Sequence, residues 1–195
     1  MRILPSQRSG RKSIFIGKMS EMYNTFDPSS HLRPPFDKEK FDTLHSWDFG
    51  WAIVDSINDA GSTEDETQLS KRLSPGQKAF YFIWHLDAQV TNGGFIQFYW
   101  NGYAKYLPPI KEGLKLIGES KIIDLIEKAD QEFKSNIDQF ITQKKKDDWE
   151  PLYEELKKFD EYDSIYYESN EAMMDKLENY ARANPDAFFQ FRQLP

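Results

Sequence analysis

Apolar residues recur along most of the chain at intervals of three and four positions, which is the spacing of one face of an α-helix. The sequence Ser-Pro-Gly-Gln at residues 74–77 predicts a helix start, with an N-cap serine, a proline in the first turn and a capping-box glutamine. The stripe that follows consists of Ala79, Ile83, Leu86 and Val90, with Phe80 and Trp84 beside it. No alternating strand pattern and no internal repeat is present. The pattern therefore predicts an all-α protein.

Similar patterns divide the rest of the chain into an arm and one helical domain. Residues 1–35 have no sustained period and are predicted to be a mobile N-terminal arm, and residues 36–195 a single compact multi-helix domain. We expect residues 61–72 to form a polar loop and Phe188, Phe189 and Phe191 to form an apolar plug. Helices are predicted at residues 36–60 with a break near Gly50, 95–104, 108–118, from a cap at Ser120 to Phe140, 148–158 and 165–183.

Asn92-Gly93-Gly94 interrupts the apolar pattern and is followed at once by aromatic residues. Glycine has no Cβ and asparagine tolerates positive φ, so this tripeptide favours a tight corner, which we expect to press against the bulky rings. Gln97 and Asn101 are four residues apart, so they share a helix face and can hydrogen-bond neighbouring backbone. The predicted structural motif consists of Asn92, Gly93, Gly94, Phe95, Gln97, Phe98 and Asn101.

A family resemblance rests on the same stretch. Residues 90–98, with Asn101 just beyond, resemble the central Asn-Gly-Gly-Phe-x-Gln-Phe motif of a bacterial all-helical family, although Thr91 stands where that motif has a second asparagine. Residues 113–133 and the acidic residues 159–189 are similar to further segments, so the resemblance spans about residues 74–191. The best-understood member of the family is a DNA mimic that binds a transcriptional regulator. The resemblance therefore implies a helical fold and a DNA-binding regulator as partner.

Charge is distributed unevenly along the chain. Residues 1–20 carry five basic residues and no acid, whereas the whole chain has a net charge of −7. Residues 147–178 hold twelve acids against three lysines, a net charge of −9. An acidic domain repels nucleic acid and attracts basic partners through a field that salt weakens. We therefore expect a basic protein as partner and no direct binding of nucleic acid.

Composition also limits location and chemistry. The chain has no cysteine, which excludes disulfides, thiolate zinc sites and cysteine nucleophiles. No apolar run reaches the length that spans a bilayer, so we expect a cytoplasmic protein without a membrane segment. The three histidines lack the spacing of a helical metal site, and we expect His85 to be hydrogen-bonded at the edge of the core. We predict no catalytic residue, cofactor or metal, and a protein that is not an enzyme.

Four acids are spaced three, four and three residues apart within the predicted helix 165–183, so they fall within an arc of about 80°. At a rise of about 1.5 Å per residue they form a line roughly 15 Å long. Their spacing of about 5 Å is comparable with one phosphate per about 3.4 Å of a DNA strand. The plain alternative is an ordinary solvated face. The predicted partner-binding residues are Asp160, Glu161, Asp163, Glu168, Glu171, Asp175 and Glu178.

Two other functions stay open from the sequence. The chain is an enzyme or small-ligand binder if the corner forms a pocket lined by Gln97, Asn101 and His85. A buried, hydrogen-bonded Gln97 would argue against this reading, and an open cleft would support it. The chain is an immunity-like neutraliser if the acidic surface binds a basic toxin. The sequence also leaves open whether the chain forms a homodimer.

Overall fold

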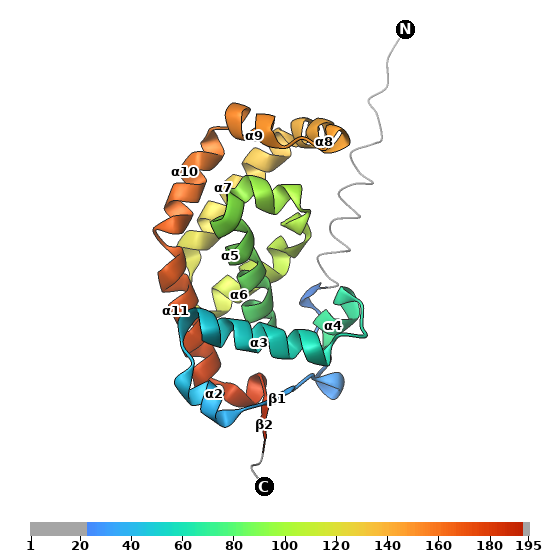
Figure 1. The fold of residues 1–195 in the computed structure, drawn as a ribbon, viewed down its shortest axis with the longest axis vertical. Helices are drawn as coiled ribbons and strands as arrows, with labels where there is room; N and C mark the ends of the chain where they lie inside the picture. The colour runs from blue at the N-terminus through green and yellow to red at the C-terminus, as the bar shows by residue number, and fades with distance from the viewer. Residues whose placement is uncertain (1–22, 193–195) are drawn as a thin grey trace.

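One long helix, α5 (Pro75–Trp100), runs through the middle of the molecule, and the other helices pack around it (Figure 1). The computed structural model describes residues 23–192. Both halves of α5 are largely buried, so this helix forms the centre of the core. The all-α class predicted from the sequence is confirmed. The surrounding helices are α2 (Lys38–Thr43), α3 (Ser46–Ala60), α4 (Glu66–Arg72), α6 (Leu107–Leu116), α7 (Ser120–Ser135), α8 (Ile137–Lys146), α9 (Glu150–Glu155), α10 (Lys158–Tyr167) and α11 (Asn170–Ala183).

The predicted capping box at the start of α5 is confirmed, and it also joins the two ends of the described chain. Ser74 Oγ accepts a hydrogen bond from Gln77 N at 3.2 Å, and Gln77 Oε1 accepts one from Ser74 N at 2.9 Å. The Gln77 side-chain nitrogen donates to the carbonyl oxygens of Leu32 at 2.7 Å and Phe188 at 2.8 Å. One helix start therefore satisfies polar backbone groups from both termini of the domain.

Two short strands that the sequence pattern did not indicate join the segment before α2 to the segment after α11. β1 (Pro35–Phe36) pairs in parallel with β2 (Gln190–Phe191). The predicted plug is largely confirmed, because Phe188 and Phe189 are buried next to this pair. Tyr23 and Leu32 are buried as well, so this part of the predicted mobile arm packs against the helical domain. Residues 1–22 of that arm lie outside the described residues.

Two predicted boundaries in the first third of the chain are wrong. The break expected near Gly50 lies instead at Leu44 and His45, between α2 and α3. Gly50 is inside α3, where the Trp84 ring packs so closely that a Cβ would lie 2.9 Å from Cε3. Glycine is thus needed there for helix packing rather than for a turn. The expected loop 61–72 contains α4. Asp65 caps this helix, because its side chain accepts hydrogen bonds from the backbone amides of Thr67 and Gln68.

The long helix predicted after Ser120 is divided into α7 and α8. Glu119 is the N-cap residue, and Asn136 separates the two helices. The Asn136 side-chain nitrogen donates to Glu132 O at 2.9 Å, and the change of direction leaves Ile137 37% exposed rather than in the core. Within residues 23–192, none of the helices is long and apolar enough to cross a membrane.

Candidate protein-binding edge and the corner behind it

The predicted corner lies inside α5, at Gly93 and Gly94. Gly93 has φ −158° and ψ 30°, and Gly94 has φ 69° and ψ −176°, so the helix stops and restarts in a new direction. The positive φ expected for this tripeptide is confirmed. The expectation that the glycines press against aromatic rings is wrong, because Gly94 faces the carboxylate of Asp163 and Gly93 faces the side chain of Gln97. Polar side chains therefore lie closest to the Cβ positions of both glycines.

Asp163 projects from α10 and caps the second half of α5. Its Oδ1 accepts a hydrogen bond from Phe95 N at 2.8 Å, the first amide after the corner. A Cβ on Gly94 would lie 2.7 Å from Asp163 Cγ, so only glycine leaves room for the carboxylate. Burial raises the pKa of Asp163 to about 6, and the hydrogen bond from Phe95 opposes that shift. Asp163 therefore acts as an N-cap supplied by another helix.

Four more side chains attach the C-terminal helices to α5 near the corner. The Tyr153 hydroxyl donates to Gly93 O at 2.7 Å, and the Tyr167 hydroxyl donates to Val90 O at 3.0 Å. Tyr166 and Asn170 each donate to Asp87 Oδ1 at 3.1 Å. Burial raises the pKa of Asp87, whereas these two bonds lower it. Sequence reasoning missed these residues, because a tyrosine in an apolar stripe gives no sign of where its hydroxyl is bonded.

The amide side chains around the corner bind one another. Gln97 is only 7% exposed, its Oε1 accepts from Asn92 Nδ2 at 2.8 Å, and its Nε2 donates to Gln89 Oε1 at 3.2 Å. Asn101 Nδ2 donates to the same Gln89 oxygen at 2.7 Å. The predicted shared face of Gln97 and Asn101 is thus confirmed, but their common partner is a side chain rather than backbone. Phe95 and Phe98 of the motif are fully buried.

The geometry argues against the corner as an enzyme pocket. A shallow hollow of about 460 Å³ lies beside Gln97 and Asn101, but Gln97 is buried with both ends of its amide bonded. His85 does not line this hollow. It packs among Tyr81, Tyr103 and Tyr106, burial lowers its pKa, and no group within residues 23–192 hydrogen-bonds its Nε2, contrary to expectation. The described residues contain no cluster of three potential metal-binding side chains.

The predicted line of four carboxylates on one helix is not formed. The expected helix 165–183 is divided, with Glu168 as the C-cap residue of α10 and α11 beginning at Asn170. Glu171 and Asp175 remain exposed on α11, whereas Met173, Leu177 and Ala181 of the same helix are buried. The break allows Asn170 to turn toward Asp87 in the core.

Glu178, the last member of that line, faces inward and has several partners. Its carboxylate accepts hydrogen bonds from Ser46 N at 2.7 Å, from Arg182 Nε at 2.9 Å and from His45 Nδ1 at 3.2 Å. Partial burial raises the pKa of Glu178, but these hydrogen bonds outweigh burial and leave the pKa below its usual value. Glu178 thus holds the start of α3 against α11. Together with Asp163, it is a structural carboxylate.

The remaining acids lie on α10 and α11, which follow one another along one side of the molecule, and on α9 and the turn before it at one end (Figure 1). Residues 159–175 contain six acids and no lysine or arginine. The three lysines of residues 147–178 have acidic partners, Asp160 for Lys157, Glu132 for Lys158 and Glu119 for Lys176. We call the exposed carboxylates the acidic edge, which comprises Asp147, Asp148, Glu150, Glu154, Glu155, Asp160, Glu161, Glu168, Glu171 and Asp175.

Comparison with known proteins gives this geometry a family. The model of the DMP19-like protein family matches residues 71–184, from the last turn of α4 to the end of α11. The chain belongs to the DMP19-like family. The DNA mimic protein DMP19 of Neisseria meningitidis serogroup B (strain ATCC BAA-335 / MC58) is 26% identical over 126 residues, which cover 62% of this chain and 75% of that protein.

The DMP19-like match confirms the family inferred from the sequence. The matched residues contain the corner, the side chains that attach α9–α11 to it, and the whole acidic edge. The part of the chain before residue 71, which contributes α2, α3 and the strand β1, lies outside the match. The predicted role of individual carboxylates in binding a partner stays a prediction.

Proposed function

We propose that this DMP19-like chain is a non-catalytic binding module that acts as a DNA mimic. Carboxylates of the acidic edge would bind the lysine and arginine side chains with which a DNA-binding protein holds phosphates. The observation that carries the proposal is the composition of residues 159–175, which contain five exposed acids and no basic residue, along α10 and α11 of a DMP19-like fold. The relative called a DNA mimic supports it.

Four acids of the acidic edge have no ion-pair partner within the described residues, which is what a binding role requires. Among residues 23–192, no ion pair involves Glu161, Glu168, Glu171 or Asp175. Glu171 and Asp175 are four residues apart on α11, so a rise of about 1.5 Å per residue separates them by roughly 6 Å along the axis. Their charges are therefore free to attract a basic surface, at a spacing of the same order as that of phosphates.

The mechanism is competition for one basic surface. A DNA-binding protein and this chain would exchange partners without any covalent step, and each would release bound ions on association. The attraction acts through solvent, so it weakens as salt is added. Asp163 and Glu178 are not contacts in this proposal, because their carboxylates are engaged within the fold.

A charge-neutral variant of the acidic edge tests the proposal against a matched control with the same loss of net charge. The edge variant carries Glu161→Gln, Glu168→Gln, Glu171→Gln and Asp175→Asn. The control variant changes four exposed acids outside residues 147–178 that have no ion pair within the described residues, Glu39→Gln, Asp55→Asn, Asp59→Asn and Asp124→Asn.

The partner is first isolated by affinity capture at low salt, and only a protein that double-stranded DNA displaces from the chain is carried forward. We expect the edge variant to bind that protein more than about tenfold more weakly, and the control variant to stay within about threefold, by fluorescence anisotropy. Equal weakening in both variants would show that only net charge matters. A captured basic protein that DNA does not displace would instead favour the neutraliser of a basic toxin.

A further inference from the structure

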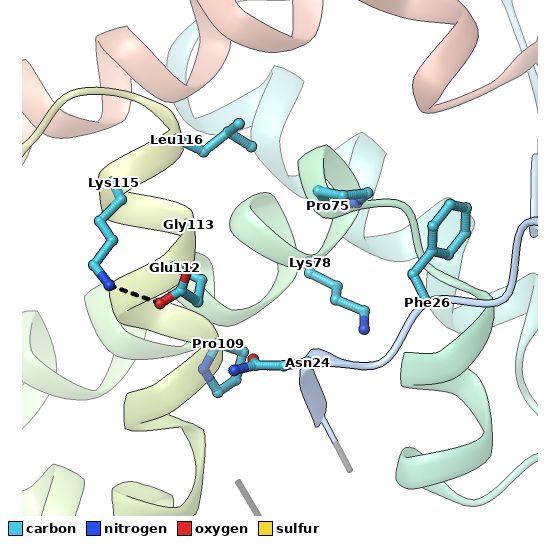
Figure 2. Close-up of a pocket in the computed structure, with 9 residues that line it drawn as sticks. All are labelled: Asn24, Phe26, Pro75, Lys78, Pro109, Glu112, Gly113, Lys115 and Leu116. Carbon is cyan, nitrogen blue, oxygen red and sulfur yellow. Dashed lines mark hydrogen bonds and ion pairs between the residues drawn. The ribbon is translucent and has the colours of Figure 1, made fainter. Parts of the chain in front are cut away.

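A pocket of about 520 Å³ lies between the first turn of α5, α6 and the segment before η1 (Pro28–Ser30). Its volume is within the range of small-molecule sites, about 300–1,000 Å³. Figure 2 shows the side chain of Lys78 in the middle of the lining residues, directed toward the segment that carries Asn24 and Phe26. The lining residues are Asn24, Phe26, Pro75, Lys78, Pro109, Glu112, Gly113, Lys115 and Leu116.

Lys78 is a buried cation without a carboxylate partner in the described chain. The residue is 6% exposed, and its Nζ donates to Tyr23 O at 2.7 Å and to Thr25 O. No ion pair within residues 23–192 includes Lys78, and Glu112 of the same pocket is bound to Lys115 at 2.8 Å. Two carbonyl oxygens leave the third N–H of an ammonium without an acceptor among these contacts. A buried charge in this state is stabilised by an anion.

The other walls favour an apolar body on that anion. Phe26, Pro75, Pro109 and Leu116 present hydrocarbon surface to the pocket, and Leu116 is 40% exposed. A doubly charged phosphate would need further donors, but the other cation of the pocket, Lys115, is bound to Glu112 at 2.8 Å. We propose that this pocket binds a small monocarboxylate with an apolar body, whose carboxylate accepts a hydrogen bond from the Lys78 ammonium. The site is independent of the DNA-mimic function.

Titration of the full chain with octanoate tests the proposal by calorimetry, with octanol and octylamine as neutral and cationic probes. We expect saturable binding of one octanoate per chain below about 5 mM, at least about tenfold tighter than either other probe. Lys78→Met keeps an unbranched side chain that is one atom shorter and removes its charge, so we expect at least a tenfold loss of octanoate affinity. Lys121→Met, at an exposed position on α7, is the control and should change nothing.

The pH profile of the unmodified chain gives a second readout that does not depend on the variant folding. Burial lowers the pKa of Lys78 to about 8, so the ammonium is lost as the pH rises above that value. Octanoate affinity should therefore be nearly constant from pH 6 to pH 7 and fall by up to about tenfold per pH unit above pH 8. The charged groups that face Lys78 are Glu112 and Lys115 of α6.

The proposal would be overturned by the absence of saturable octanoate binding, by an unchanged affinity in folded Lys78→Met, or by equal binding of octanol. An affinity that stays flat from pH 7 to pH 10 would do so as well, because the carboxylate would then not depend on the ammonium.

Discussion

Replacing Gly94 with alanine tests how the corner in α5 is held. The backbone of Gly94, with φ 69° and ψ −176°, lies in a region open almost only to glycine, so a side chain there costs about 1–3 kcal/mol. The new Cβ would also displace Asp163, whose carboxylate accepts a hydrogen bond from Phe95 N. A bond to a charged group contributes about 1.5–3 kcal/mol. We therefore expect Gly94→Ala to lower the free energy of unfolding by about 2.5–6 kcal/mol.

Gly102→Ala is the matched control for this substitution. Gly102 also has a positive φ, 79°, but a Cβ there would meet nothing within 4 Å. Only the conformational cost of the left-handed region remains, about 1–2 kcal/mol. The difference between the two variants therefore reports the contact between the corner and Asp163, together with the higher backbone cost of a side chain at the ψ of Gly94.

Urea unfolding at neutral pH, followed by far-UV circular dichroism, measures both variants. The reasoning is refuted if Gly94→Ala and Gly102→Ala differ by less than about 1 kcal/mol. Adding Asp163→Ala supplies a further check, because the cost of Gly94→Ala should be smaller in that background. Additive effects of the two substitutions would show that the carboxylate and the glycine do not interact.

Two further predictions concern the structural carboxylates. Glu178→Gln should cost about 1.5–3 kcal/mol at neutral pH in urea unfolding, whereas exposed Glu171→Gln should change stability by less than about 0.5 kcal/mol. The pKa of Glu178 is lowered, so the contribution of its carboxylate to the free energy of unfolding is present above pH 4.5 and is lost as the pH falls through the folded-state pKa. A difference in stability between the two variants that does not change with pH would contradict this. Asp163 should titrate near pH 6 by NMR of its carboxyl carbon, and a midpoint below pH 4 would exclude the burial effect. Because its pKa is raised, the folded state binds this proton up to a higher pH than the unfolded state does. The free energy of unfolding should therefore fall as the pH rises from about 4 to 6, and Asp163→Asn should lack this pH dependence.

Periodicity predicted the helices well but not where they bend. The stripe of α5 and its Ser74 cap are local patterns, and both are confirmed. The breaks at Asn136 and after Glu168 depend on contacts distant in sequence, such as Asn170 with Asp87, so an apolar spacing that continues across them gives no signal. A two-residue strand pair is likewise too short to leave a pattern.

The candidate site was predictable as a charged region but not residue by residue. Charge counts located the acids of residues 147–178 correctly. They could not show that Asp163 and Glu178 turn inward, because the residue type alone does not distinguish an acid that binds the backbone of another helix from one that faces solvent. Nor could they find Lys78, whose burial results from the folding of residues 23–25 over it.

The hydrogen bonds that join α9 and α10 to α5 affect the rate and the heat-capacity change of binding to a partner. These bonds involve Tyr153, Asp163, Tyr166 and Tyr167. They fix α9 and α10 to the most buried helix, so the acidic edge is arranged before any partner arrives. A partner that docks there loses its own freedom of motion but orders nothing on this side. Association should therefore be fast and steered by charge, and should lack the large negative heat-capacity change that accompanies folding upon binding.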